Sequence, residues 1–266
     1  MIYGADGVGA EDPAEVYHEA SKLYPSFAGR QTRGWLIERN QAIAAATLRA
    51  VKRHPLAEAI PLPPARFPAV SLEQAVARRK STRSFAPGRP LELEGVGTML
   101  HAAYGVTHQL DPDAPAGSSP SFRTVPSGGG LYPLELYVAA LEVAGLPSGL
   151  YHFDPLRHVL ECLQRRDLRS ELSRAAVHED VIATAGAVVV VSAMFWRSRF
   201  KYGQRSYRFA LLEAGHVVQN LLLTAAALGL GAVPIGGFYD RRLDDLLAID
   251  GVNESAVYSA VVGALP

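Results

Sequence analysis

The 266-residue sequence contains one cysteine, Cys162, which excludes an intramolecular disulfide and a zinc site built from cysteines. It has no charge excess, because 26 basic and 26 acidic residues cancel, and this argues against nucleic-acid or membrane-surface partners. The first residues lack the basic region and apolar core of a signal peptide. The longest apolar stretch, 221–233, is too short to span a bilayer. These absences predict a soluble, cytoplasmic protein.

Apolar periodicity predicts an α+β protein, a sheet flanked by helices. The expected helices are 71–79, 91–104, 168–176, 180–185, 207–230 and 241–247, and the expected strands are 134–141, 150–153, 158–163, 187–192, 232–238 and 256–263. Two more helices are expected at 11–23 and 34–53. The stretch PLPPARFP at 61–68 breaks these off, so we expect a helical N-terminal extension over 1–66 and a second domain over 67–266.

Three consecutive glycines stand in PSGGGLYPLELYV, residues 126–138, directly before a predicted strand. Glycine runs cost stability unless the backbone needs a positive φ or must approach something closely. The sequence has no GxxxxGK[ST] motif, and no GxGxxG motif follows a strand and opens a helix, so a P-loop and a Rossmann site are not indicated. A flat ligand lying against backbone amides and a tight loop without a ligand both stay open.

A basic cluster, RRKSTRSF at 78–85, follows the helix predicted at 71–79. If the chain is extended there, Arg79, Ser81 and Arg83 point to one side, because side chains alternate along a strand. Two guanidiniums and a hydroxyl on one side would suit a phosphate. The alternative is that these cations only complement the helix dipole.

The helix predicted at 207–230 is apolar nearly all round, which predicts that it is buried. Glu213, His216 and Asn220 are spaced i, i+3, i+7 and form one polar row, which could be a satisfied hydrogen-bond network. A metal interpretation also exists, because Glu213-x-x-His216 has a second copy in Glu15-x-x-His18. No four-helix bundle is predicted, so we expect no metal.

The connection FWRSRFKYGQRSYRF, residues 195–209, concentrates aromatic and basic side chains, Lys201 and Tyr202 among them. One interpretation is a solvated basic loop that grips a partner. The other is catalytic: lysine can act as a base where burial or a neighbouring cation lowers its pKa, and Arg199, Arg205 and Arg208 could supply that cation.

Together these stretches resemble the nitroreductase-like flavoprotein superfamily, and more closely its SagB-type branch, the dehydrogenases of thiazole- and oxazole-modified peptide biosynthesis. The matching segments run in family order from about residue 70 to 266; beyond those quoted above they include LHAAYGVT, GLYHFDPLRHVLE, KYGQRSYRFALLEAGHVVQN and GLGAVPIGGFYD. A short stretch, YHEASK at 17–22, also resembles a motif of that branch's N-terminal region.

The resemblance implies a nitroreductase-like fold with a mixed, mainly antiparallel sheet, an intertwined homodimer, and flavin mononucleotide (FMN) held at the subunit interface. It assigns the flavin phosphate and ribityl chain to Arg79, Ser81 and Arg83. It assigns the flavin ring to the glycine segment and to a second turn, namely Pro126, Ser127, Gly128 and Gly129 with Pro234, Ile235, Gly236 and Gly237. Residues Arg208, Glu213, His216 and Asn220 are expected to support the site. Many nitroreductases add a basic residue beyond the last strand, whereas this sequence ends GALP.

The resemblance also implies a reaction. In azoline oxidases of this branch a Lys-Tyr pair carries proton transfer, and Lys201-Tyr202 matches it. We therefore expect FMN-dependent oxidation of a thiazoline or oxazoline ring in a peptide or carrier-bound substrate, with a modifying-complex partner or carrier protein. The alternatives are an NAD(P)H-dependent nitro or quinone reductase, another FMN-dependent desaturase of an amino-acid-derived or tethered intermediate, and a non-catalytic partner subunit.

Overall fold

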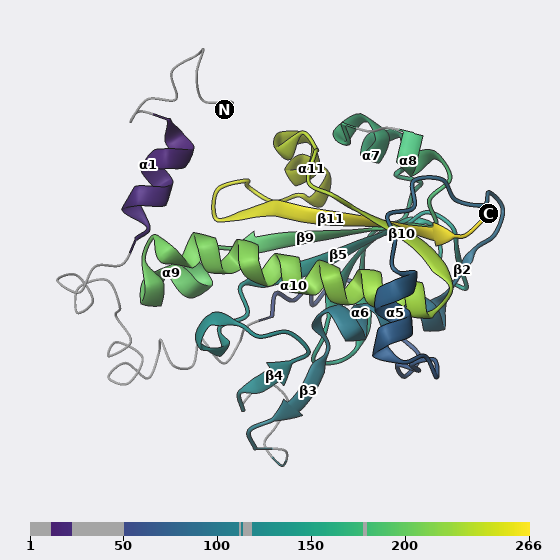
Figure 1. Ribbon diagram of the computed structural model, residues 1–266, viewed down its shortest axis with the longest axis horizontal. Coiled ribbons are helices and arrows are strands. Elements are labelled where there is room, and N and C mark those ends of the chain that lie inside the picture. Colours follow the sequence, from purple (N-terminus) through teal and green to yellow (C-terminus); the bar gives the residue numbers. More distant parts are fainter. Residues whose placement is uncertain (1–11, 23–50, 112, 114–118, 178–179) are drawn as a thin grey trace.

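The computed structural model describes residues 12–22, 51–111, 113, 119–177 and 180–266. Its centre is a seven-stranded sheet of order β1-β8-β7-β5-β9-β11-β10, antiparallel at every pair. The strands are β1 (Ala59–Pro61), β5 (Leu134–Ala140), β7 (Gly149–Asp154), β8 (Val159–Gln164), β9 (Ala187–Met194), β10 (Leu230–Ile235) and β11 (Glu254–Ala264). Two small sheets accompany it: a parallel pair, β2 (Leu91–Glu92) with β6 (Val143–Ala144), and a hairpin, β3 (Val106–Gln109) with β4 (Ser121–Arg123), which projects from the body (Figure 1).

Helices cover both faces of the main sheet (Figure 1). The helices are α1 (Pro13–Ala20), α5 (Leu72–Arg78), α6 (Leu93–Tyr104), α7 (Arg169–Ala175), α8 (Asp180–Ala183), α9 (Trp196–Tyr202), α10 (Arg205–Ala227) and α11 (Asp240–Leu247). Side chains alternate along the strands, so Leu136 of β5 packs with α6 and α10 on one face. Its neighbour Tyr137 packs with α7, α8 and α11 on the other.

The predicted α+β class and the sheet flanked by helices are confirmed. The prediction of a mixed, mainly antiparallel sheet holds for its antiparallel part. Within the described residues, parallel pairing is confined to the small β2–β6 pair and to a single bridge between Ser81 and Ala232. The cap predicted at Ser71 is present, because Ser71 and Gln74 form a capping box at the start of α5.

The junction before the second domain differs from the prediction. Residues 59–61 fall within the predicted helical extension, but as β1 they pair with β8 at the edge of the main sheet. The helix predicted at 34–53 lies mostly outside the described residues, and its described end, 51–53, is not helical. The N-terminal helix predicted at 11–23 is present as α1. The sequence did not predict β1 because prolines argue against a strand. The structure accommodates Pro61 because β1 lies at the edge of the sheet.

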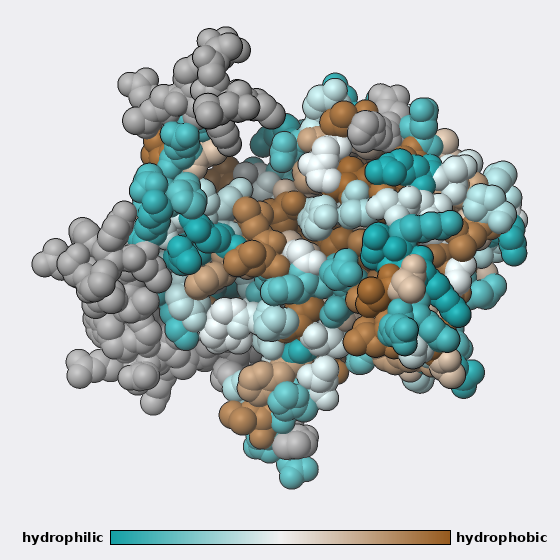
Figure 2. All heavy atoms as spheres, in the orientation of Figure 1, coloured by the Kyte–Doolittle hydropathy of each residue, from teal (hydrophilic) through white to brown (hydrophobic). Residues whose placement is uncertain are grey.

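Two further predictions about the 195–227 region are wrong. The aromatic and basic stretch read as a connection is helix α9, which Gly203 ends, followed by the first turns of α10. The long helix is not buried all round, since it exposes an outer face: Tyr207, Leu211, Leu212, Gly215, His216 and Gln219. Apolar side chains gather where α10 crosses the front of the molecule (Figure 2). By length and composition α10 could cross a membrane, but half of its most apolar window is buried in the fold.

Candidate active site

The glycine segment forms a short 3₁₀ turn, Gly128–Gly130, directly before β5. Gly129 has φ 66° and Gly130 φ 65°, a region that residues with a Cβ rarely adopt. Two hydrogen bonds to Ser127 hold the turn. The Tyr132 amide donates to Ser127 Oγ at 2.9 Å, and the Gly130 amide donates to the Ser127 carbonyl at 3.1 Å. Gly129, Gly130 and Pro126 are exposed. The turn therefore presents bare backbone to the outside.

Lys201 and Tyr202, at the end of α9, lie against this turn although they are 72 and 73 positions after Gly129 in the sequence. A Cβ placed on Gly129 would lie 2.5 Å from Tyr202 Oη and 2.7 Å from Lys201 Nζ. A Cβ on Gly128 would lie 3.2 Å from Phe209, whose ring packs edge-on against Tyr202 at 5.1 Å. Both side chains of the pair are half-buried. Glycine is favoured at position 129 because a Cβ there would displace the ends of the Lys201 and Tyr202 side chains and would have to adopt a positive φ.

Glu213 lies buried beneath the same turn, 3% exposed. Tyr104 Oη donates to Glu213 Oε1 at 2.8 Å, and Oε2 has no partner among the described residues. Burial raises the pKa of Glu213 to about 7, against the opposing effects of the Ser127 and Tyr104 hydroxyls and of Arg123. This carboxyl can therefore gain or lose a proton near neutral pH.

The wall beside Glu213 comes from residues that sequence reasoning did not select. The Arg123 guanidinium lies over the rings of Tyr104 and Tyr132, at 4.1 and 4.7 Å from their centroids. Tyr132 Oη accepts from the Arg123 amide at 3.0 Å. The one feature of the sequence that could have pointed to this wall was a basic residue, Arg123, three positions before the PSGGG motif. Its stacking partners depend on strand pairing that the sequence does not reveal.

The predicted phosphate cluster runs extended after α5, as the sequence analysis assumed. Ser81 forms a parallel bridge with Ala232 of β10, and the Thr82 amide donates to the Ala232 carbonyl at 3.0 Å. Thr82 faces Gly231 of β10, and its neighbours Ser81 and Arg83 are exposed. Arg79 is half-buried, and within the described chain none of these three side chains has a hydrogen bond or ion pair. Their donors are available to an anion.

The Pro234–Gly237 turn lies at the same end of the sheet as the glycine turn and α9. Strands β9 and β10 both pair antiparallel with β11, so they run in one direction. Strand β9 leads into α9, and the start of β5, just after the glycine turn, pairs with the end of β9 at Ala193. Gly236 and Gly237 are exposed, and their amides make no hydrogen bond to a described residue.

This arrangement fits a phosphorylated flat ring. Bare backbone from two turns would meet the ring, and the unpaired donors of Arg79, Ser81 and Arg83 beside β10 would meet the phosphate. The fit depends on glycine at position 129, where a Cβ would fill the space beside the Lys201–Tyr202 pair.

The other predicted support residues do not form one network. Arg208 donates to Ser21 Oγ of the N-terminal segment at 2.5 Å, so its guanidinium is directed toward that segment. His216 is exposed, whereas Glu213 is buried, so the Glu213-x-x-His216 pair does not converge on one site. Asn220 Nδ2 donates to the Ala102 carbonyl at 3.1 Å and joins α10 to α6. Helical spacing placed these residues near one another but could not tell which way the helix faces.

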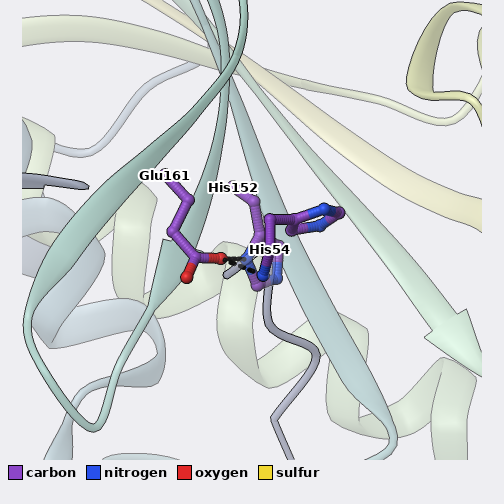
Figure 3. Close-up of side chains that lie close together, drawn as sticks. All are labelled: His54, His152 and Glu161. Atoms are coloured by element: carbon purple, nitrogen blue, oxygen red, sulfur yellow. Dashed lines mark hydrogen bonds and ion pairs between the residues drawn. The ribbon is translucent and has the colours of Figure 1, made fainter. Parts of the chain in front are cut away.

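A second buried polar cluster lies on β5, β7 and β8. His152 contacts Glu135 through Nε2 at 2.7 Å and Glu161 through Nδ1 at 3.1 Å, and all three are almost fully buried. Figure 3 shows His152 between Glu161 and His54. Burial opposes a charge on His152, but hydrogen bonds to the two carboxylates raise its pKa to about 9. His152 is therefore an imidazolium at neutral pH.

Among the described residues, His54, His152 and Glu161 form a group close enough to hold a metal ion. Both ring nitrogens of His152 are already engaged by carboxylates, and as an imidazolium it has no lone pair to offer. His54 Nε2 has no partner, but its ring is only half-buried. The hydrogen bonds to Glu135 and Glu161 therefore account for both ring nitrogens of His152 without a metal ion.

Comparison with known proteins extends these observations. A family model described as the nitroreductase family matches residues 76–264. MJ1384 of Methanocaldococcus jannaschii, a protein provisionally named as a nitroreductase, is 37% identical over 68% of this chain and 85% of its own length. The trifolitoxin-processing protein TfxB of Rhizobium leguminosarum bv. trifolii is 30% identical over 53% of this chain. The microcin B17-processing protein McbC of Escherichia coli is 30% identical over 48%. The chain covers 39% of TfxB and 49% of McbC.

Solved structures share the fold. A protein from Anabaena variabilis described as a nitroreductase matches 94% of this chain with a TM-score of 0.70 and 25% identity, over 45% of its own length. A chain of the E. coli microcin synthetase McbBCD complex with truncated pro-MccB17 bound matches 93% of this chain and 99% of its own length with a TM-score of 0.59 and 20% identity. A Desulfovibrio desulfuricans protein in complex with FMN covers 73% of this chain and 86% of its own, with a TM-score of 0.50 and 20% identity.

Proposed function

Because the chain belongs to the nitroreductase family, we propose that it is an FMN-dependent dehydrogenase that oxidises a thiazoline or oxazoline ring to an azole during peptide natural-product biosynthesis. The observation that carries the proposal is the contact of Lys201 and Tyr202 with the glycine turn at Gly129. Similarity to TfxB and McbC, whose names give trifolitoxin and microcin B17 processing, supports a peptide substrate.

FMN is the cofactor that the donor set fits. Arg79 and Arg83 would hold the phosphate with Ser81, and the backbone of Gly128, Gly129, Gly236 and Gly237 would lie along the ring beside Pro126, Ser127, Pro234 and Ile235. A nitroreductase-fold relative that binds FMN supports this assignment. When bound, the flavin supplies hydride acceptance, and the protein supplies binding, orientation and electrostatics.

The side chains of this protein would accept the proton that the azoline ring loses. Lys201, or Tyr202 assisted by it, would remove a proton from a carbon of the azoline ring held over the glycine turn. Lys201 Nζ lies 5.4 Å from the centroid of the Tyr202 ring, so the two groups share one small space. General-base catalysis by a positioned side chain contributes about 10²- to 10⁴-fold.

We infer that the active form is a homodimer. The outer face of α10 exposes Tyr207, Leu211 and Leu212, and Leu212 is 58% exposed. A contiguous apolar face on a helix is typical of an interface between subunits. A modifying complex or carrier protein would deliver the substrate, which agrees with the McbBCD assembly in which the related fold occurs.

A nicotinamide-dependent nitro or quinone reductase is the second candidate, favoured by the 37% identity to MJ1384. The two candidates differ in the source of electrons. Incubation with a synthetic peptide that bears one thiazoline should yield a product lighter by two hydrogens. Rapid reduction of the bound flavin by NADPH, with no change in the peptide, would favour the reductase instead.

A further inference from the structure

We propose that Arg197 is the positioning residue that holds Lys201 and Tyr202 against the glycine turn. The inference rests on the proposed function, because that function requires Lys201 and Tyr202 to be held in one position. Arg197 itself stays away from the substrate, since its side chain is buried and directed into the sheet.

The contacts of Arg197 join the two parts of the site. Its Nη2 atom lies 2.6 Å from Glu135 Oε1 of β5, and both side chains are less than 8% exposed. Its Nη1 atom donates to the carbonyl of Tyr132 at 3.4 Å. Tyr132 follows the glycine turn by two residues, so one guanidinium fixes α9 relative to both the strand and the turn. The planar fork of arginine presents separate N–H groups to the carboxylate and to the carbonyl.

Helix α9 needs such an anchor. It has seven residues, no side-chain hydrogen bond at its N-cap, and an end at Gly203 with φ 56°. Isolated helices of this length are unstable in water, so their position depends on tertiary contacts. Arg197 stands four residues before Lys201, which is one turn along the same helix face. An anchor at Arg197 therefore fixes the direction from which Lys201 leaves the helix.

Glu135 is itself held rigidly. It receives the Lys52 amide at 2.8 Å on Oε1 and His152 at 2.7 Å on Oε2. Burial opposes its charge, but Arg197 and His152 lower the pKa of Glu135 to about 2. The carboxylate stays ionised and oriented, so Arg197 meets a fixed partner.

The helix offers a matched control in Arg199. It lies on the same short helix but is exposed, and its side chain has no hydrogen bond or ion pair in the described part of the chain. Arg197→Met and Arg199→Met therefore make the same chemical change with and without the anchor.

The test uses the full FMN-loaded protein and two readouts. The sequence has four lysines, Lys22, Lys52, Lys80 and Lys201, so protein labelled with [ε-¹³C]lysine gives one signal for each, and Lys201→Ala assigns the fourth. The second readout is kcat and KM for the thiazoline peptide. In Arg197→Met we expect the Lys201 signal to move toward that of exposed Lys80, and kcat to fall about tenfold to a hundredfold with KM little changed. Arg197→Lys should recover part of both, and Arg199→Met should change neither.

An unchanged Lys201 signal and kcat in folded, flavin-loaded Arg197→Met would overturn the inference. If that variant does not fold, Glu135→Gln keeps the size of the partner, removes its charge, and must produce the same two changes. If the wild-type protein does not turn over the peptide, the proposed function fails, and the lysine signal alone still decides whether Arg197 positions Lys201.

Discussion

Gly129 lies directly against Tyr202, so that a Cβ added to the glycine would come within 2.5 Å of the phenolic oxygen. The two residues are 73 positions apart in the sequence, one before β5 and one at the end of α9. Because of this contact, the glycine turn and the Lys201–Tyr202 pair form one site.

Alanine at position 129 should damage the site more than alanine at position 130. Both glycines have φ near +65°, so either substitution should cost about 1–2 kcal/mol of stability. Only at Gly129 does the new Cβ meet Lys201 and Tyr202; at Gly130 nothing lies within 4 Å. We expect Gly129→Ala to melt no higher than Gly130→Ala, because it adds this contact to the same backbone cost, and to turn over more slowly. Equal turnover for the two variants would contradict the contact.

Glu213 should make the stability of the folded protein depend on pH between about 4.5 and 7. Its pKa is raised to about 7 on folding, so its contribution is complete below the pKa of the unfolded chain and is lost as the pH rises through 7. The loss is about 1.4 kcal/mol per pH unit in that range. Urea unfolding of Glu213→Gln at several pH values should lack this slope. A slope identical to that of the wild-type protein would show that another group titrates.

His152 should also make the folded protein less stable as the pH rises, but over a higher pH range than Glu213. Its pKa is raised to about 9, so the stability that it contributes is complete below pH 6.5 and disappears as the pH rises through 9. His152→Gln should be less stable at pH 7, because Glu135 and Glu161 lose their shared cation. Its unfolding free energy should also change less between pH 7 and 9. Equal stability of the two proteins at pH 7 would refute the ion-pair assignment.

A charge on the outer face of α10 should separate the subunits. Leu212→Glu places a carboxylate on the exposed apolar face, whereas Leu56→Glu places one at a fully exposed position elsewhere. Sedimentation velocity should give a dimer for the wild-type protein and for Leu56→Glu, and a monomer with weaker flavin retention for Leu212→Glu. A wild-type monomer that retains flavin would remove the proposed interface.

Much of the sheet could be predicted because its strands carry strong local signals. The run AVVVVS marks β9 as a central buried strand, and the apolar run at 134–141, after the glycines, marks β5. The sequence could not reveal β1, whose proline is tolerated only because β8 pairs with it at the sheet edge. Helix α9 was missed because a seven-residue helix is too short to show periodicity.

The site could be predicted in part. Extended backbone at 79–83 and the glycine turn follow from local chemistry, and their expected geometry is present. The Arg197–Glu135–His152 chain was not found, since it depends on the pairing of Tyr137 with His152 across β5 and β7. The exposed face of α10 could not be predicted because apolar composition alone does not distinguish a helix buried all round from one with an exposed apolar face.

The most direct test of the account is anaerobic mixing of the purified FMN-loaded protein with a thiazoline peptide, followed by flavin absorbance. We predict that one equivalent of peptide bleaches the flavin and becomes the thiazole. Lys201→Ala, carrying the same amount of flavin, should bleach at least about a hundredfold more slowly. A wild-type flavin that stays oxidised with the peptide, or a Lys201→Ala protein that bleaches as fast as wild type, would contradict the account.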